Sequence, residues 1–205
     1  MRFAGLLPAA SALLFFAWLG AEVLRGGTQA FDDRIRMLVH ANATPALTMV
    51  MRAISLIGYP AVLIALAVPA VVWSVRMGKA RWASRFAISV AGAEVLEQLL
   101  KLVFHRPRPD TFFGLSGPMG YSFPSGHALV SFAFFGALAV FAAPRRWWYY
   151  TAAALPIAAI GLSRIYLGMH YPSDVLGGWA AGTVLLLSVA WARRVTAPSG
   201  SRKPL

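Results

Sequence analysis

The sequence contains no cysteine and few charged residues. Its 205 residues include 7 Asp and Glu and 19 Lys and Arg, so only 13% of the chain is charged. Soluble chains usually carry about 25% charged residues, and a chain of this size with so little charge lacks the surface of a soluble domain. The absence of cysteine excludes a disulfide, a thiolate nucleophile and a cysteine-ligated metal.

Apolar residues make up 59% of the chain, and the mean hydropathy is +0.64. They occur in blocks close to the length of about 20 residues that a helix needs to cross a bilayer. We therefore predict an all-α fold, a polytopic membrane helical bundle with six transmembrane helices, in one domain over residues 1–195. Residues 196–205 are rich in Pro, Ser, Lys and Arg, a composition that predicts a disordered basic tail. The six spans are expected over roughly residues 6–24, 53–75, 82–104, 127–143, 147–167 and 175–191.

A short amphipathic segment over residues 31–40 separates the first two spans. On a helix, its charged residues would occupy one face, and the opposite face would carry Phe31, Ile35, Leu38 and Val39. This pattern is typical of a helix that lies in the membrane interface.

Basic residues are concentrated near both termini and after the second and fourth predicted spans. With six spans, all of these regions lie on one side of the membrane, and cationic loops are typical of the cytoplasmic side. We expect an integral inner-membrane protein with both termini in the cytoplasm and the segments after spans one, three and five outside. This topology accounts for the net charge of +12 without nucleic-acid binding, so membrane lipids are the expected surroundings.

Three polar segments stand at span ends that are expected on the outer side: residues 101–109, 124–127 and 163–174. Consecutive spans reverse direction, so the end of the third meets the start of the fourth, and the end of the fifth meets the start of the sixth. The three segments are therefore expected to converge. Ionisable side chains are costly near a bilayer, and their concentration here predicts a functional site.

Several residues of these segments are of types that bind an anion. Lys101 and Arg108 offer a point charge and a planar fork of donors, and Arg164 can add a further clamp. Ser125 and Gly126 open the fourth span, where unpaired backbone N–H groups favour an anion and glycine allows a close approach. Each residue also has an ordinary alternative, because such cations can extend to lipid headgroups and Ser125 can cap the helix.

His127, His170 and Asp174 supply acid–base groups. His170 and Asp174 are four residues apart, so on a helical turn the carboxylate would accept the imidazole Nδ1–H and leave Nε2 as nucleophile or base. Pro172 allows this contact if it occupies the first turn of a helix. On its own, His127 at the start of a helix would be interpreted as a residue that only stabilises the fold. Because His170 is expected at the same place, we interpret His127 as a second imidazole of the site.

A metal centre and a transport pathway are competing interpretations. Only Asp110 and Asp174 are acidic in this part of the chain, and the five bases nearby would repel a divalent cation. We therefore predict no metal and no cofactor. A transporter would need paired broken helices and internal pseudo-symmetry, and neither is evident in the sequence. Glu94, Glu97 and Lys101 share one face of the third span, which favours intrahelical charge pairing.

The three segments read Lys, six residues, Arg-Pro; then Pro-Ser-Gly-His; then Ser-Arg, five residues, His, three residues, Asp. This order resembles the tripartite signature of the type 2 phosphatidic acid phosphatase (PAP2) superfamily, and every specified position is matched. The six-span layout is similar to that of its bacterial integral-membrane branch. The resemblance rests on residues 101–174, and the first 100 residues support it only through topology.

The resemblance implies a role for each matched residue. His170 would attack phosphorus and form a phosphohistidine, Asp174 would orient His170, and His127 would protonate the leaving oxygen. The phosphoryl oxygens would be held by Lys101, Arg108, Ser125, Gly126 and Arg164.

The implied enzyme is a metal-independent phosphatase that hydrolyses a lipid phosphate or diphosphate at the outer membrane face. A polyprenyl diphosphate, phosphatidate or phosphatidylglycerol phosphate would fit. A lipid phosphotransferase using the same intermediate stays open as an alternative, and the sequence does not indicate the oligomeric state.

Overall fold

The computed structural model describes residues 6–117, 119–142 and 147–195. These residues contain no β-strand and form eight α-helices: α1 (Leu6–Arg25), α2 (Gln29–Ala41), α3 (Pro45–Ile57), α4 (Pro60–Arg76), α5 (Ala80–Phe104), α6 (Gly126–Ala142), α7 (Trp147–Tyr166) and α8 (Pro172–Val195). The all-α prediction is confirmed. The predicted tail, 196–205, lies outside the described residues.

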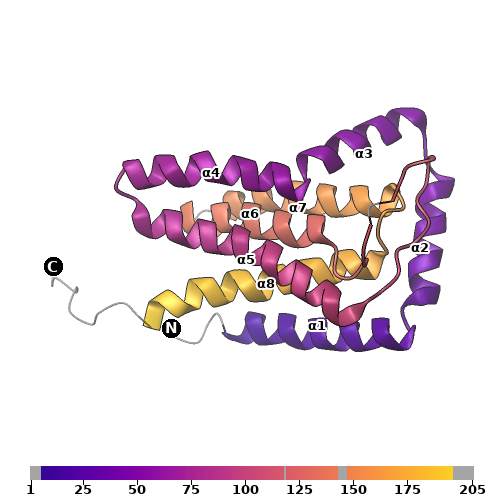
Figure 1. The fold of residues 1–205 in the computed structure, drawn as a ribbon, viewed down its shortest axis with the longest axis horizontal. Helices are drawn as coiled ribbons and strands as arrows, with labels where there is room; N and C mark the ends of the chain where they lie inside the picture. The colour runs from indigo at the N-terminus through magenta and orange to yellow at the C-terminus, as the bar shows by residue number, and fades with distance from the viewer. Residues whose placement is uncertain (1–5, 118, 143–146, 196–205) are drawn as a thin grey trace.

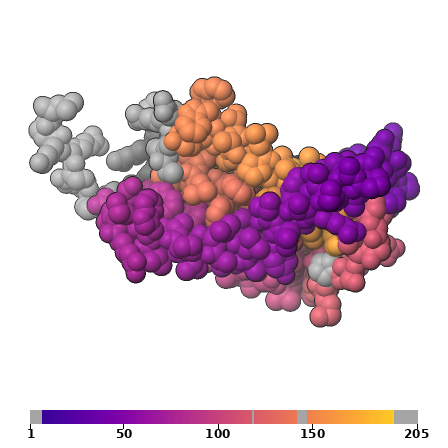
Figure 2. All heavy atoms as spheres, turned by 90° about the horizontal axis from the view of Figure 1, so that it is seen from above, coloured from indigo at the N-terminus to yellow at the C-terminus, as the bar shows by residue number. Residues whose placement is uncertain are grey.

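Six helices, α1 and α4 to α8, run along the long axis of the molecule, and α2 lies across one end of them (Figure 1). α3 leans over the same end. Seen from above, α3 and α4 cover one face, with α7 beside them (Figure 2). α1 begins and α8 ends at the opposite end of the bundle. The polar segments that follow α5 and α7 therefore lie next to α2.

The central helix is α6, which packs against α5, α7 and α8. Its sequence carries no charged residue and is apolar on all sides, which suits a helix surrounded by others. Leu129, Val130 and Ala133 are fully buried and belong to one cluster with Phe86 of α5. This packing places the N-terminus of α6 in the middle of the polar end of the bundle.

Two glycines let α8 approach α6 closely. A Cβ on Gly178 would lie 2.7 Å from the carbonyl oxygen of Ser125, and a Cβ on Gly182 would lie 3.0 Å from the Phe132 side chain. Small residues spaced four apart are a common means of bringing membrane helices together. The contact holds the beginning of α8, and with it Asp174, against the beginning of α6.

The second predicted span, 53–75, is two helices instead of one. α3 and α4 meet at an angle of 47°. Tyr59 is extended, and Pro60 begins α4 because its fixed φ suits a first helical position and its missing N–H needs no partner there. The break brings Ser55 and Tyr59 towards the polar end of the bundle.

The predicted interfacial helix exists as α2, and Arg34 is exposed and Asp33 partly exposed on it, but the other two charges are not. Asp32 and Arg36 are buried, while Phe31 and Leu38 are exposed. Ile35 does pack inward, against a cluster that includes α8 residues. The prediction was wrong for these two charges, because their buried partners come from distant segments, which a helical periodicity cannot reveal.

Length and hydropathy identify α1 and α8 as able to cross a membrane, and the bent α3–α4 pair as a third such unit, within the part of the chain that the structure describes. α6 is apolar but has 17 residues. α5 carries charged residues along its length. The six-span count therefore stays a prediction.

Candidate active site

The polar end of the bundle contains a cavity of about 260 Å³. Six of the eight predicted site residues line it: Lys101, Arg108, Gly126, His127, Arg164 and His170. The other two, Ser125 and Asp174, lie directly behind it and contact each other, because the Ser125 N–H donates to the Asp174 carbonyl oxygen at 2.9 Å. The structure thus brings together all eight residues from α5, α6, α7, α8 and the adjoining loops.

His170 and Asp174 form a buried pair. His170 Nδ1 lies 3.3 Å from Asp174 Oδ2, and the Tyr171 N–H donates to the same oxygen at 2.9 Å. Pro172 begins α8, as the contact requires. An ionised carboxylate only accepts, so this arrangement assigns the proton to Nδ1 and leaves the Nε2 lone pair directed away from Asp174.

Arg108 is fixed beside that lone pair. Its Nη1 lies 3.2 Å from His170 Nε2 and donates to the Met169 carbonyl oxygen at 3.2 Å, while its Nε donates to the Gly120 carbonyl oxygen at 3.1 Å. Two backbone acceptors therefore hold the guanidinium in place, and no carboxylate of the described residues forms an ion pair with it. A cation held in this way can bind an anion next to Nε2.

Burial is the main reason that the pKa of His170 lies well below its ordinary value of 6.5. The charges of Arg164, Arg108 and Lys101 act in the same direction, and a backbone hydrogen bond with Ser122 opposes them. The imidazole is therefore neutral at pH 7. Burial also lowers the pKa of Arg108, but a guanidinium remains charged at this pH.

The remaining two cations that line the cavity, Lys101 and Arg164, each contact a side chain of a neighbouring turn or helix. Lys101 forms an ion pair with Glu97, so the predicted intrahelical pairing is present. Arg164 of α7 is buried and donates to Ser55 Oγ of α3. A Cβ on Gly126 would lie 2.5 Å from Glu97 Oε1, so a larger residue here would displace the Glu97 carboxylate.

Ser125 is fully buried, and its Oγ has no hydrogen-bond partner among the described residues. It precedes α6 but forms no side-chain cap, so its ordinary alternative role is absent. The first N–H groups of a helix also lack intrahelical partners. Ser125 Oγ and the N-terminus of α6 therefore offer hydrogen bonds that the folded chain itself leaves unused.

His127 lies on the first turn of α6 and is buried. Its ring meets that of Tyr59 edge to face, with the ring centroids 5.5 Å apart. Tyr59 and Ser55 are site residues that the sequence did not reveal, because they lie in an apolar segment without a polar pattern. The break between α3 and α4 brings Tyr59 to the cavity wall and Ser55 to Arg164.

A second set of residues was also missed. Arg106 donates to Asp174 Oδ1 at 2.7 Å, and on its other side it donates to Asp32 Oδ2 at 2.7 Å. Thr28 and Ser173 complete this group, and none of its members lines the cavity. We call Thr28, Asp32, Arg106 and Ser173 the rear cluster. Arg106 lies inside the polar segment 101–109, so the sequence could have indicated it as a site residue. Its partner Asp32, 74 residues away, lies in no such motif.

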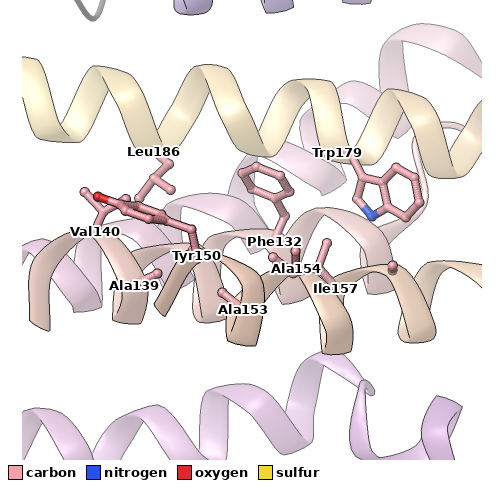
Figure 3. A pocket seen from close by; sticks show the side chains of 11 residues that line it. Phe132, Ala139, Val140, Tyr150, Ala153, Ala154, Ile157, Trp179 and Leu186 are labelled. Atoms are coloured by element: carbon pink, nitrogen blue, oxygen red, sulfur yellow. The ribbon is translucent and has the colours of Figure 1, made fainter. Parts of the chain in front are cut away.

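A further cavity of about 370 Å³ lies between α6, α7 and α8 (Figure 3). Its walls are apolar and aromatic, with Phe132 between Trp179 and Tyr150. Among the described residues, its lining includes no Asp, Glu, His, Lys or Arg. Within the described residues there is also no cluster of three His, Asp or Glu side chains placed to hold a metal ion. Among the described residues, the histidines and cations that the sequence singled out therefore meet in the cavity beside His170.

Comparison with known proteins gives consistent relatives. Residues 82–196 match the model of the PAP2 superfamily. Phosphatidylglycerophosphatase B of Bacillus subtilis is 29% identical over 187 residues, covering 87% of this chain and 91% of that protein. Lipid A 1-phosphatase of Rhizobium johnstonii is 38% identical over 117 residues, covering 51% of this chain and 46% of that protein, so the match spans about half of that relative.

A solved structure is also similar over nearly the whole chain. The crystal structure of a transmembrane PAP2 type phosphatidylglycerolphosphate phosphatase from Bacillus subtilis has a TM-score of 0.83 and 27% sequence identity. The similarity covers 93% of this chain and 98% of that one. The arrangement of helices that surrounds the cavity therefore has a counterpart of known structure.

Proposed function

Since the chain belongs to the PAP2 superfamily, as predicted, and its relatives above are all named as phosphatases, we propose that it is a membrane lipid phosphatase acting through a phosphohistidine on His170. This proposal rests mainly on the geometry of the His170 ring. Its Nδ1 contacts Asp174, and its Nε2 lies 3.2 Å from Arg108 Nη1. A nucleophilic nitrogen beside a fixed cation suits attack on a phosphoryl group, whose charge the cation stabilises.

In the first step, the cavity cations and the α6 N-terminus hold the phosphoryl oxygens. His170 Nε2 forms a bond to phosphorus while the bond between phosphorus and the lipid oxygen breaks. His127 gives its proton to that oxygen, and the lipid leaves as an alcohol, or as a monophosphate where the substrate is a diphosphate. Asp174 stabilises the positive charge that the imidazole acquires.

In the second step, water replaces the lipid oxygen. His127, now neutral, takes a proton from water as it attacks phosphorus, and the bond between phosphorus and Nε2 breaks. The electron pair returns to His170, and inorganic phosphate leaves. Arg108 and Arg164 remain charged throughout, so the phosphoryl charge is balanced without a metal.

The walls of the cavity support a lipid substrate. An apolar groove of about 430 Å³ between α4 and α5 adjoins it, and Ile64 and Glu94 line both spaces. A phosphate held by the cations can therefore remain attached to a hydrocarbon chain beside α4 and α5. Phosphatidate, phosphatidylglycerol phosphate and a polyprenyl diphosphate all have this form.

We also propose the topology that the charges predict, with six spans in the inner membrane, both termini in the cytoplasm and the cavity on the outer side. The lengthwise arrangement of α1 and α4 to α8 supports six spans (Figure 1). The exposed residues Lys79 and Ser116 lie at opposite ends of this bundle. In intact cells, a membrane-impermeant maleimide should label Ser116→Cys and not Lys79→Cys, and the reverse pattern would contradict this topology.

The activity is tested with the full chain purified in detergent. Phosphate release is measured from phosphatidate, phosphatidylglycerol phosphate and a polyprenyl diphosphate, with EDTA present. We expect release from at least one lipid at a rate that EDTA leaves unchanged. Complete loss restored only by a divalent cation would overturn the metal-free mechanism, and transfer of phosphate to an added lipid alcohol in place of water would identify a phosphotransferase.

A further inference from the structure

The rear cluster contains two buried charges for which the proposed mechanism has no use. Asp32 on α2 is fully buried, and Arg106, after α5, is 8% exposed. Buried charges are costly unless they are paired and hydrogen-bonded. Both are paired here, and the pairing leads directly to the carboxylate that contacts the proposed nucleophile.

Arg106 links two carboxylates with its two terminal nitrogens. Nη1 donates to Asp174 Oδ1 at 2.7 Å and to Ser173 Oγ at 2.7 Å. Nη2 donates to Asp32 Oδ2 at 2.7 Å and to Thr28 Oγ1 at 3.2 Å. The planar guanidinium therefore fixes the position of Oδ1, while the opposite oxygen of Asp174 faces His170.

Asp32 is also fixed in position by several hydrogen bonds. The Ser173 N–H donates to Asp32 Oδ1 at 2.9 Å, and the Ser173 hydroxyl donates to Asp32 Oδ2 at 2.6 Å. Ser173 directly precedes Asp174 on the first turn of α8. α2, which lies across the end of the bundle (Figure 1), is thus tied to the same turn that carries the His170 partner.

The charges explain why two carboxylates share one guanidinium. If Arg106 had Asp174 as its sole anionic partner, its positive charge would offset the negative charge that Asp174 presents to His170. Asp32 supplies a second negative charge on the far side of Arg106. The imidazole, whose charge rises when it is phosphorylated, then faces a carboxylate whose field is not cancelled.

We propose that Asp32 and Arg106 are positioning residues that fix Asp174 and maintain its charge towards His170. This role deepens the proposed function and rests on the phosphohistidine proposed there. It assigns a task to α2, which contributes no group to the cavity. It also distinguishes Asp32 from its neighbour Asp33, which is partly exposed and lies 3.7 Å from Arg36.

The test is Asp32→Asn, with Asp33→Asn as the matched control, measured by rapid quench with an activated aryl phosphate. We expect Asp32→Asn to slow phosphoenzyme formation by roughly 10- to 100-fold, the size of effect known for residues that orient metal-ligating histidines. The fraction of folded enzyme and the affinity for the substrate, read from the concentration dependence of the single-turnover rate, should change little. Asp33→Asn should match the wild type in all three values.

A merely structural role gives a different result. Misfolding lowers the amount of active enzyme and leaves the rate constant of the remaining molecules unchanged, and that outcome would overturn the proposal. The double variant with Arg106→Lys should be no slower than the slower single variant, because both changes disturb one linkage. Additive losses would contradict a shared role.

Two further outcomes keep this inference separate from the proposed function. If the wild type forms no phosphoenzyme, the phosphohistidine mechanism is wrong and the positioning role fails with it. If the wild type forms one and Asp32→Asn forms it equally fast, only the positioning role fails. Should Asp32→Asn not fold, Thr28→Val keeps both charges and removes one acceptor of Arg106, and an unchanged rate constant in this variant would equally overturn the role.

Discussion

The two sides of the His170–Asp174 pair differ in whether their polar groups already have partners. On the cavity side, Ser125 Oγ and Arg164 Nε are buried without a hydrogen-bond partner among the described residues. In the rear cluster, Arg106 donates four hydrogen bonds and Asp32 accepts three. Both sides are buried and charged, so burial and charge alone do not separate them.

The difference indicates a division of tasks. A buried polar group without a partner costs free energy, and where it adjoins a cavity a ligand can supply the missing hydrogen bond. A group with all its bonds made within the chain gains nothing from a ligand and instead fixes its neighbours. We therefore assign substrate binding to the cavity side and positioning to the rear cluster, with His170 between them.

The largest effect is expected from a change of His170, which lies between the cavity and the rear cluster. His170→Ala should abolish turnover and any trapped phosphoenzyme, a loss of roughly 10⁴-fold or more, because it removes the nitrogen that is proposed to accept the phosphoryl. Phosphate release and alkaline-stable incorporation of labelled phosphate measure both. His40→Ala is the matched control, since His40 is exposed on α2 outside the cavity, and phosphoenzyme in His170→Ala would refute the assignment.

His127→Ala should have the next largest effect, and it should depend on the substrate. Loss of a general acid costs roughly 10²- to 10⁴-fold on a lipid ester. A p-nitrophenyl ester has a leaving group that needs the proton less, so part of the rate should return. Relative rates on the two esters measure this recovery. Recovery in His170→Ala and not in His127→Ala would reverse the two roles.

The serines on the two sides offer a direct comparison. Ser125→Ala should lower kcat/KM by roughly 10- to 100-fold, the value of a hydrogen bond to a charged group, and leave thermal stability unchanged because Oγ has no partner to lose. Ser173→Ala removes a hydroxyl between Arg106 and Asp32 and should lower stability by about 1–3 kcal/mol. Activity assays and thermal unfolding in detergent test both.

The opposite result would remove the distinction between the two sides. If Ser125→Ala is destabilised and Ser173→Ala is not, the missing partner of Ser125 does not reflect a ligand site. If both variants lose activity in proportion to stability, neither side has a separate role in substrate binding.

The sequence predicted the cavity side because its residues lie in short motifs at helix ends. Lys101 and Arg108 on one segment and His170 and Asp174 on another have fixed spacings, and antiparallel helices bring helix ends together. Helix positions were also predictable from apolar blocks of the right length. The break between α3 and α4 was not, since Pro60 inside an apolar run fits both a continuous span and a new helix.

The rear cluster was not predictable for a physical reason. Asp32 lies in an amphipathic segment whose periodicity assigned its charge to the solvent, and only tertiary contact with Arg106 and Ser173 makes burial favourable. Those contacts join residues 74 and 141 positions apart. A single sequence records the spacing within a motif, but it does not record which distant charge will neutralise a buried one.

The smallest expected effect concerns pH, and it tests which side of His170 controls its charge. Burial, together with Arg164, Arg108 and Lys101, holds the pKa of His170 well below 6.5, so the nucleophile should stay neutral as the pH falls. An imidazole with the ordinary pKa would be only about 10% neutral at pH 5.5, and its rate would fall about tenfold between pH 7.5 and 5.5. We expect a change of less than about twofold for phosphoenzyme formation, since a lowered pKa moves the loss of activity to more acidic pH. The measurement uses His127→Ala with a p-nitrophenyl ester, because a general acid would add its own titration to the profile. A tenfold fall over this range would mean that the charge of Asp174, supported by the rear cluster, outweighs the cavity cations at His170.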